Sequence, residues 1–193
     1  PALMSIRSYS YINLVSTSVT ITDSVTTFGD SAFSNTALTS VDFSNATALT
    51  EIGHQAVYKA TALTSVDFSY ATALKTIDYY AFYSATALTS VTIGGNVTEI
   101  GSYAFYQATN LISVDFSGAT ALTTIGASAF RNSALTSVIL PNNLEEIGPY
   151  AFKDTALTSV TLPEGLKEIG ASAFNGASAL TSINLPDSVT TIG

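Results

Sequence analysis

Residues able to do acid–base or metal chemistry are few in this chain of 193 residues. It has one histidine, His54, no cysteine, and fourteen Asp and Glu. Without cysteine, neither a disulfide nor a thiolate zinc site can form. His54 follows a glycine in the stretch EIGHQAV, where we expect an exposed turn. Since no Ser-His-Asp grouping, phosphate-binding glycine loop or metal-ligand spacing is present, we predict no catalytic residue, no metal, no cofactor and no enzymatic activity.

Tyrosine is the residue type whose placement favours binding. Seven of the ten tyrosines lie within one stretch of 49 residues. In three successive repeats a tyrosine directly follows the repeated Phe, or Val57, which replaces that Phe in one repeat. In two of these repeats a second tyrosine lies three residues before the first. Such clusters are typical of protein and glycan recognition, because each ring brings a large area and a polar tip. The alternative is a self-stacking ladder that only stabilises its flank. The candidate ligand-binding residues are Tyr58, Tyr80, Tyr83, Tyr103 and Tyr106.

A repeat must position these tyrosines. The phrase that opens IGxxAF recurs in steps of 22 to 25 residues, which falls inside the roughly 20–29-residue band of leucine-rich repeats. Its anchoring apolar residues are Phe28, Ile52, Ile77, Ile100, Ile125, Ile147, Ile169 and Ile192.

Each unit has the same apolar skeleton. Before the anchor lies a strand in which Val66 and Phe68 share one face, while Ser65 and Asp67 point to the other. After the anchor, Ala-Phe is predicted on a helical or 3-10 turn. One unit cannot bury its own apolar residues, but stacked units cover one another. The sequence therefore predicts a repeat solenoid: a right-handed superhelix of about eight coils, with a parallel β-sheet on one face and helical or 3-10 turns on the other.

Two further columns follow from the stacking. The Phe of each turn should form a buried column, made of Phe33, Phe82, Phe105, Phe130, Phe152 and Phe174. A glycine follows the anchor in every unit except one, which has Asp78. Because Gly and Asp both visit positive φ, we predict a left-handed turn at this position.

The outward face of the predicted sheet carries columns of Ser and Thr. These hydroxyls would order water, carry O-linked sugars, or simply be soluble strand residues. Asp42 and Asp67 are predicted to stand one strand spacing apart, either solvated or around a calcium ion, although two carboxylates are weak evidence for such a site. Asn45 and Asn96 begin Asn-x-Thr sequons and are candidate glycosylation sites.

Composition excludes two classes of partner. The net charge is −8 and only 10% of residues are charged. Nucleic acid requires a basic stripe, and an anionic membrane surface attracts polybasic segments, so we expect neither. No run approaches the roughly 20 apolar residues of a membrane span, so we expect no membrane insertion.

Residues 91–105, VTIGGNVTEIGSYAF, and 160–174, VTLPEGLKEIGASAF, resemble the BspA-like leucine-rich repeats of bacterial surface proteins and of surface antigens of parasitic protists. The resemblance covers about residues 19–193. It implies a curved solenoid, an extracellular or cell-surface location, and adhesion or partner binding. The chain has Ala where the family often has Cys after the Phe, and three coils (AFSNTAL, AFRNSAL and AFKDTAL) are one residue shorter there.

The two ends of the chain look complementary. Residues 1–18 are predicted to be a degenerate N-terminal half-coil or cap, and 19–193 the repeats, with the last coil incomplete. Aligning SYINL with TSINL places Tyr9 on Leu180. Either the chain is a slice of a longer array, or its ends join head to tail in a filament, since a heterologous contact that does not close is open-ended. The candidate assembly residues are Leu3, Ile12, Leu14, Val189 and Ile192.

These observations predict a non-catalytic extracellular or cell-surface scaffold that adheres to or binds a protein or glycan. The alternative is the structural subunit of an extracellular filament, formed by self-association end to end.

Overall fold

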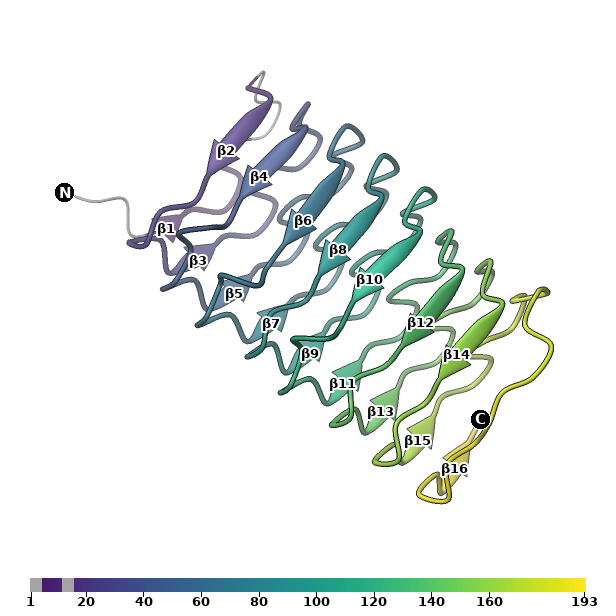
Figure 1. The fold of residues 1–193 in the computed structure, drawn as a ribbon. Coiled ribbons are helices and arrows are strands. Elements are labelled where there is room, and N and C mark those ends of the chain that lie inside the picture. Colours follow the sequence, from purple (N-terminus) through teal and green to yellow (C-terminus); the bar gives the residue numbers. More distant parts are fainter. Residues whose placement is uncertain (1–4, 12–15) are drawn as a thin grey trace.

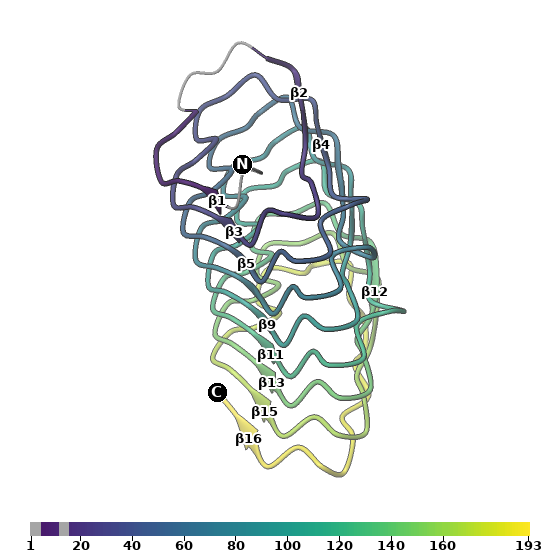
Figure 2. The same ribbon diagram turned by 90° about the vertical axis from the view of Figure 1, so that its left-hand side faces the viewer.

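The computed structural model describes residues 5–11 and 16–193, and Leu3, Ile12 and Leu14 lie outside these residues. The described chain forms a solenoid of stacked coils (Figure 1). Two columns of short parallel strands run along it on different sides of the coils (Figure 2). No helix occurs among the described residues, so the prediction of helical or 3-10 turns is wrong.

The two-residue strands, each ending at an anchor position, pair in chain order as one nine-stranded parallel sheet, the anchor sheet. Its nine strands bound eight coils, which confirms the predicted number. These strands are β1 (Ser5–Ile6), β3 (Thr27–Phe28), β5 (Glu51–Ile52), β7 (Thr76–Ile77), β9 (Glu99–Ile100), β11 (Thr124–Ile125), β13 (Glu146–Ile147), β15 (Glu168–Ile169) and β16 (Thr191–Ile192).

The three-residue strands form the second column, the face strands. In most of them the central Val is buried and its two neighbours point outward, as period-two alternation requires. They are β2 (Ser18–Thr20), β4 (Ser40–Asp42), β6 (Ser65–Asp67), β8 (Ser90–Thr92), β10 (Ser113–Asp115), β12 (Ser137–Ile139) and β14 (Ser159–Thr161).

The core is a file of phenylalanine rings along the solenoid axis. Phe105 stacks on Phe82 at 5.2 Å and on Phe130 at 5.3 Å between ring centroids, with interplanar angles of 8° and 3°. The file continues through Phe152 to Phe174 in steps of 5.4 and 5.5 Å. This confirms the predicted column: each ring inside the file is covered by the coils before and after it, and Phe174 ends the file with one stacked neighbour.

The glycines after the anchors serve a different purpose from the predicted one. None of them has positive φ, so the predicted left-handed turn is wrong there. Instead, the N–H of Gly126 donates to the anchor carbonyl of Ile100 at 2.8 Å. A Cβ at Gly126 would lie 2.6 Å from the backbone N of Ser102. Glycine is required because the backbones of stacked coils approach too closely for a side chain.

The left-handed residues lie later in each turn. In coil after coil, the residues two and six positions beyond the glycine position have positive φ, as in Tyr80 (59°) and Ser84 (54°). Their N–H groups donate to the next coil: Tyr80 to Ser102 C=O at 3.1 Å and Ser84 to Tyr106 C=O at 2.8 Å. Hydrogen bonds between coils thus stabilise the turn, where the sequence predicted the bonds within a helix.

The face strands do not form one sheet. They pair as β2–β4, β6–β8–β10 and β12–β14, with no strand pairing between β4 and β6, between β10 and β12, or beyond β14. The predicted neighbours Asp42 and Asp67 stand on either side of the first break.

The breaks coincide with changes in turn length. From the Phe position to the Leu before the face strand there are five residues in some coils, as from Phe130 to Leu135, and six in others, as from Phe105 to Leu111. Coils of β4, β12 and β14 have five, and coils of β6, β8, β10 and the last coil have six. Pairing is absent at all three changes of length, which we interpret as a displacement of one strand against the next.

The N-terminal alignment of the sequence also needs correction. Ile6 of β1 pairs with Phe28 and so occupies an anchor position. Tyr11 then takes the place of the column Phe, and its ring stacks on Phe33 at 5.0 Å and 9°. Tyr9 lies at positive φ in the turn and does not correspond to Leu180. The anchor pattern therefore extends further toward the N-terminus than the SYINL match implied.

Candidate binding site

The turns beyond the anchor sheet position the predicted tyrosines. Tyr58, Tyr83 and Tyr106 directly follow the core column, so each is one coil from the next. Their rings stack, with Tyr83 at 5.0 Å and 14° from both Tyr58 and Tyr106. Stacking at coil spacing follows from the repeat itself, since equivalent residues of successive coils are neighbours.

The second predicted column adjoins the first. Tyr80 and Tyr103 stack at 5.0 Å, and they contact the first column through Tyr83 at 5.1 Å and Tyr106 at 5.6 Å. Both have positive φ of 59°, which is uncommon for a bulky residue. The structure therefore brings all five predicted tyrosines together on one half-exposed surface.

Two members of this surface were missed from sequence. Tyr79 contacts Tyr80 at 3.9 Å and Tyr103 at 5.6 Å between centroids, and its side chain is exposed. His54, expected to be a simple exposed turn residue, is half-buried and stacks on Tyr79 at 5.3 Å. They occupy the same position in successive coils, two residues after the paired anchors Ile52 and Ile77, so the repeat itself makes them neighbours. The next coil has Ser102 at this position, so the column has only two aromatic members and was not recognised. We call the seven residues the tyrosine flank: His54, Tyr58, Tyr79, Tyr80, Tyr83, Tyr103 and Tyr106.

Cations lie at both ends of the first column. The Lys59 Nζ is 5.2 Å from the centroid of the Tyr58 ring. At the other end, Arg131 Cζ lies 5.7 Å from the Tyr106 ring and 6.0 Å from that of Tyr150. A cation over an aromatic face is attracted by the ring quadrupole. The stack thus ends in a cationic side chain on both sides, and Arg131 Nε also lies 3.7 Å from Oδ2 of Asp154.

The turns as a whole are less acidic than the rest of the chain. From residue 29 onward, the segments between each anchor and the following Leu contain three Lys or Arg and three Asp, so they are neutral, whereas the whole chain has a net charge of −8. These residues are Asp30, Lys59, Asp78, Arg131, Lys153 and Asp154. A neutral flank with local cations suits a neutral or weakly acidic partner.

The packing of the flank raises two phenol pKa values. The side-chain hydrogen bond with Tyr79, together with burial, raises the pKa of Tyr80 to about 12. Burial, with the neighbouring Tyr106 and Tyr58, raises the pKa of Tyr83. In both cases the neutral phenol is favoured.

Alkaline conditions are expected to destabilise the fold through this flank. Between pH 10 and pH 12 the folded chain holds the Tyr80 proton that the unfolded chain releases, so the free energy of unfolding falls as the pH rises through this interval. Urea unfolding followed by circular dichroism at several pH values measures the slope. Tyr80→Phe is expected to flatten it, and a variant with the wild-type slope would contradict the assignment.

The carboxylates of the face strands act locally. The Oδ1 atoms of Asp42, Asp67 and Asp115 accept the N–H of the residue two positions on, at 2.8 to 2.9 Å. These backbone bonds, from Ser44 and Ser117, lower the pKa of Asp42 and Asp115. Among the described residues no group of three or more potential metal-ligating side chains occurs. The three carboxylates therefore cap the turns that follow their strands.

The Thr column before the face strands is also structural. Thr89 Oγ1 donates to Thr64 C=O at 3.0 Å, and Thr158 Oγ1 to Thr136 C=O at 3.0 Å. These hydroxyls bind the coil before them, so they tie coils together. The adjoining Ser side chains of the face strands are exposed.

The remaining sequence candidates are exposed or lie at the last coil. Asn45 and Asn96 are both exposed, and the Asn96 side-chain amide donates to Thr72 C=O at 2.6 Å. On the last coil, Val189 is half-buried and Ile192 is 59% exposed. In the described parts of the chain, no helix has the length and apolar character that crossing a bilayer requires.

Comparison with known proteins gives a family. The family model of the BspA type leucine rich repeat region matches residues 4–122 and 123–193 in six copies. The comparison with curated proteins gave no match. The matching family is defined by its repeat and not by an enzymatic activity.

Solved structures show the same repeat architecture. A leucine rich repeat protein of T. pallidum is 32% identical, with 75% of this chain and 67% of that chain covered and a TM-score of 0.67. A leucine-rich repeat protein of Bacteroides ovatus is 22% identical, with 91% and 54% covered and a TM-score of 0.55. A leucine rich cell surface protein of Faecalibacterium prausnitzii is 24% identical, with 98% and 73% covered and a TM-score of 0.43. With a family model along nearly its whole length and solenoid coils at the matching period, this chain belongs to the BspA-type leucine-rich repeat family.

Proposed function

We propose that this chain is a non-catalytic, extracellular or cell-surface scaffold that binds a protein or glycan partner through the tyrosine flank. The observation that carries the proposal is a continuous surface of seven aromatic side chains, joined by ring contacts and bordered by Lys59 and Arg131. Tyr and Arg are enriched among the residues that dominate binding energy at interfaces. A rigid solenoid presents them without a large ordering cost on binding.

Two features favour binding over a purely structural ladder. Tyr79 lies at the edge of the flank and is 37% exposed, so its ring is accessible to a partner and is not part of the buried core. Two successive coils also place a tyrosine at positive φ, Tyr80 and Tyr103, at a position that holds Ser or Gln in four other coils and a tyrosine in two coils outside the flank, Tyr9 and Tyr150. A backbone conformation that is unfavourable for a bulky residue points to a role beyond stability.

Binding is tested with the whole chain on a glycan array and on a panel of immobilised extracellular proteins. For the partner so found, Tyr83→Ala and Tyr79→Ala are expected to weaken binding about tenfold or more, equivalent to roughly 1.4 kcal/mol. The matched control is Tyr70→Ala, because Tyr70 is 58% exposed and makes no ring contact with the flank. If Tyr83→Ala lowers stability and leaves binding intact, the flank is only a structural ladder.

The second candidate is a filament subunit that joins end to end. The exposed apolar side chains of the last coil favour it, since Leu185 is 50% and Ile192 59% exposed. In this alternative a second copy covers that edge by heterologous contact. Sedimentation velocity and electron microscopy of residues 1–193 test it, with Ile192→Asp expected to stop assembly. A monomer that persists at high concentration would exclude the filament.

A further inference from the structure

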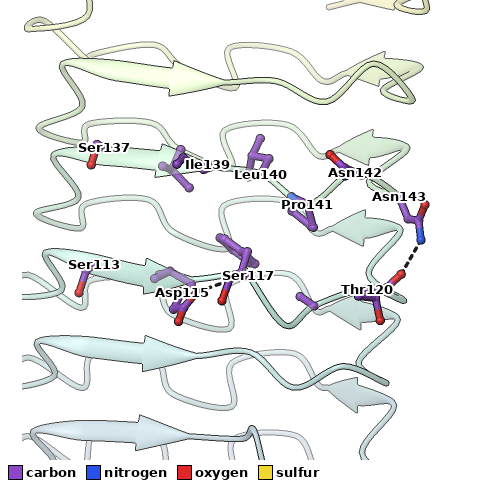
Figure 3. Close-up of a pocket in the computed structure, with 14 residues that line it drawn as sticks. Ser113, Asp115, Ser117, Thr120, Ser137, Ile139, Leu140, Pro141, Asn142 and Asn143 are labelled. Carbon is purple, nitrogen blue, oxygen red and sulfur yellow. Dashed lines mark hydrogen bonds between the residues drawn. The ribbon is translucent and has the colours of Figure 1, made fainter.

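The break between β10 and β12 forms a groove of about 590 Å³ on the face of the solenoid (Figure 3). On the β10 side it is lined by polar residues, among them Ser113 and Asp115, and on the β12 side by Ile139, Leu140 and Pro141. The Asn143 side-chain amide donates to Thr120 C=O and so joins the two coils at one end of the groove (Figure 3).

Backbone groups at this groove lack the partners that they have elsewhere. Next to paired strands, the residue after each face strand donates its N–H to the following coil: Phe68 to Thr92 C=O and Ile93 to Asp115 C=O, both at 3.0 Å. At the break, the corresponding bond between Phe116 N–H and Ile139 C=O is missing among the described backbone hydrogen bonds. Buried N–H and C=O groups are nearly always paired, by protein, water or a ligand. The groove thus exposes one donor and one acceptor of an interrupted parallel ladder.

The side chains around the break differ from those on the rest of the face. Two outward columns, the residue before each face strand and the last residue of the strand, otherwise hold Thr, Asp or Asn. Their two aliphatic members are Ile112, which precedes β10, and Ile139 of β12, and they are 55% and 74% exposed. Both stand beside the same break. They lie at opposite ends of the break, three residues apart in register, so they offer two separate apolar contacts to an extended strand in the open ladder.

We propose that this groove binds an extended peptide segment of a partner protein. The segment runs parallel to β10 and β12, accepts a hydrogen bond from Phe116 N–H and donates one to Ile139 C=O. One aliphatic side chain of the segment packs on Ile139, and a second, near the other end of the segment, packs on Ile112. Main-chain bonds supply affinity and alternate side chains supply selectivity. This site is separate from the tyrosine flank and does not depend on it.

The charge of the groove restricts the charge of the segment that can bind there. Asp115 is the one charged side chain lining the groove, and the Ser117 N–H that it accepts favours its ionised form by lowering its pKa. With no cation in the lining, an acidic segment is disfavoured. A neutral or basic peptide is the complementary occupant.

Insertion of a peptide strand requires the solenoid to open at this point. Some Cα atoms of β10 and β12 lie within 8 Å, whereas a strand between them needs two strand spacings, roughly 9.6 Å. The anchor strands β9, β11 and β13 remain paired across the break. Full insertion therefore separates the coils on one face only, with the anchor sheet as the hinge.

The chain itself supplies the probe. Residues 158–162, TSVTL, already pair in parallel with the other edge of β12, where Leu140 N–H donates to Thr161 C=O at 3.1 Å and Thr158 N–H to Thr136 C=O at 2.8 Å. We expect a fluorescent, C-terminally amidated TSVTL peptide to bind saturably in anisotropy titrations. The same peptide with methylated amide nitrogens keeps its side chains and loses its donors, so its affinity should fall about tenfold or more.

Variants identify the site. Inserting one alanine in each of two turns, between Ser133 and Ala134 and between Thr155 and Ala156, gives the coils of β12 and β14 the six-residue length of the coils on either side. β12 should then pair with β10 without a new break at β14, and binding should be lost. Ile139→Thr, which keeps the backbone, should weaken binding several-fold. Ser65→Ala on the paired strand β6 should leave it unchanged. Hydrogen exchange at Phe116 N–H should slow with peptide bound, while Phe68 N–H is unaffected.

Three results would overturn the proposal. The first is the absence of saturable binding at millimolar peptide, which would mean that the groove binds no peptide and holds only water. The second is equal affinity for the methylated and unmethylated peptides, which would mean that main-chain hydrogen bonds do not hold the segment. The third is a dimer of the chain that protects Phe116 by itself, which makes a second copy the occupant. None of these bears on the tyrosine flank, whose variants are measured with a different partner.

Discussion

Phe105→Ala is expected to lower the free energy of unfolding by about 3–5 kcal/mol. The Phe105 side chain is fully buried, with Phe82 stacked on one side at 5.2 Å and Phe130 on the other at 5.3 Å. Both neighbouring coils are fixed to the coil of Phe105 by backbone bonds, from Phe82 N–H to Ala104 C=O and from Phe105 N–H to Ala129 C=O, so they cannot close the cavity. Urea unfolding followed by circular dichroism measures the change.

The control for this variant is Phe174→Ala at the end of the column. Phe174 is half-buried and stacks only on Phe152, at 5.5 Å. Because it has one stacked neighbour and contact with solvent, its truncation should cost clearly less than that of Phe105. A cost below about 1 kcal/mol for Phe105→Ala would show that the column is not the core.

Gly126→Ala is the second change with a large expected effect. Its Cβ would lie 2.6 Å from Ser102 N and 2.8 Å from Gly101 C, both backbone atoms of the preceding coil. Relief requires the two coils to separate and strains the bond from Gly126 N–H to Ile100 C=O, which is 2.8 Å long. We expect a loss of about 1–3 kcal/mol, as for other overpacked sites, measured by the same unfolding experiment.

Gly118→Ala is the matched control, since it adds the same methyl group in the same part of the solenoid. The nearest atom to its Cβ would be Ile93 O at 3.7 Å, an ordinary contact, and φ is not positive there. We expect a change within about 0.5 kcal/mol. Equal losses for both variants would mean that close approach of the coils is not the reason for the glycine.

The sequence predicted the columns because a repeat makes sequence position equivalent to spatial position. A period of 22 to 25 residues places residues such as Phe82 and Phe105, or Tyr83 and Tyr106, in successive coils. Their contact then follows from stacking alone. For this reason the solenoid, the Phe column and the five predicted tyrosines were all accessible without coordinates.

Contacts that cross between columns were not accessible in this way. The contacts of Tyr79 with Tyr80, at 3.9 Å, and with Tyr103, at 5.6 Å, join the short column of His54 and Tyr79 to the rest of the flank. These contacts between columns depend on how far each turn projects from the coil. The glycine after each anchor was visible in the sequence. Its cause is the short distance between the backbones of stacked coils, which the spacing of residues in the sequence does not give.

The amino-acid sequence by itself therefore determined the period, the family and the residues that line up along the axis of the solenoid. Tertiary structure decided where the face sheet is interrupted. A difference of one residue between the Phe130 and Phe105 turns is visible in sequence, but its effect is not. A parallel ladder tolerates little displacement between strands, so one residue fewer ends the pairing of β10 with β12 and leaves the groove open, while the anchor sheet continues across it.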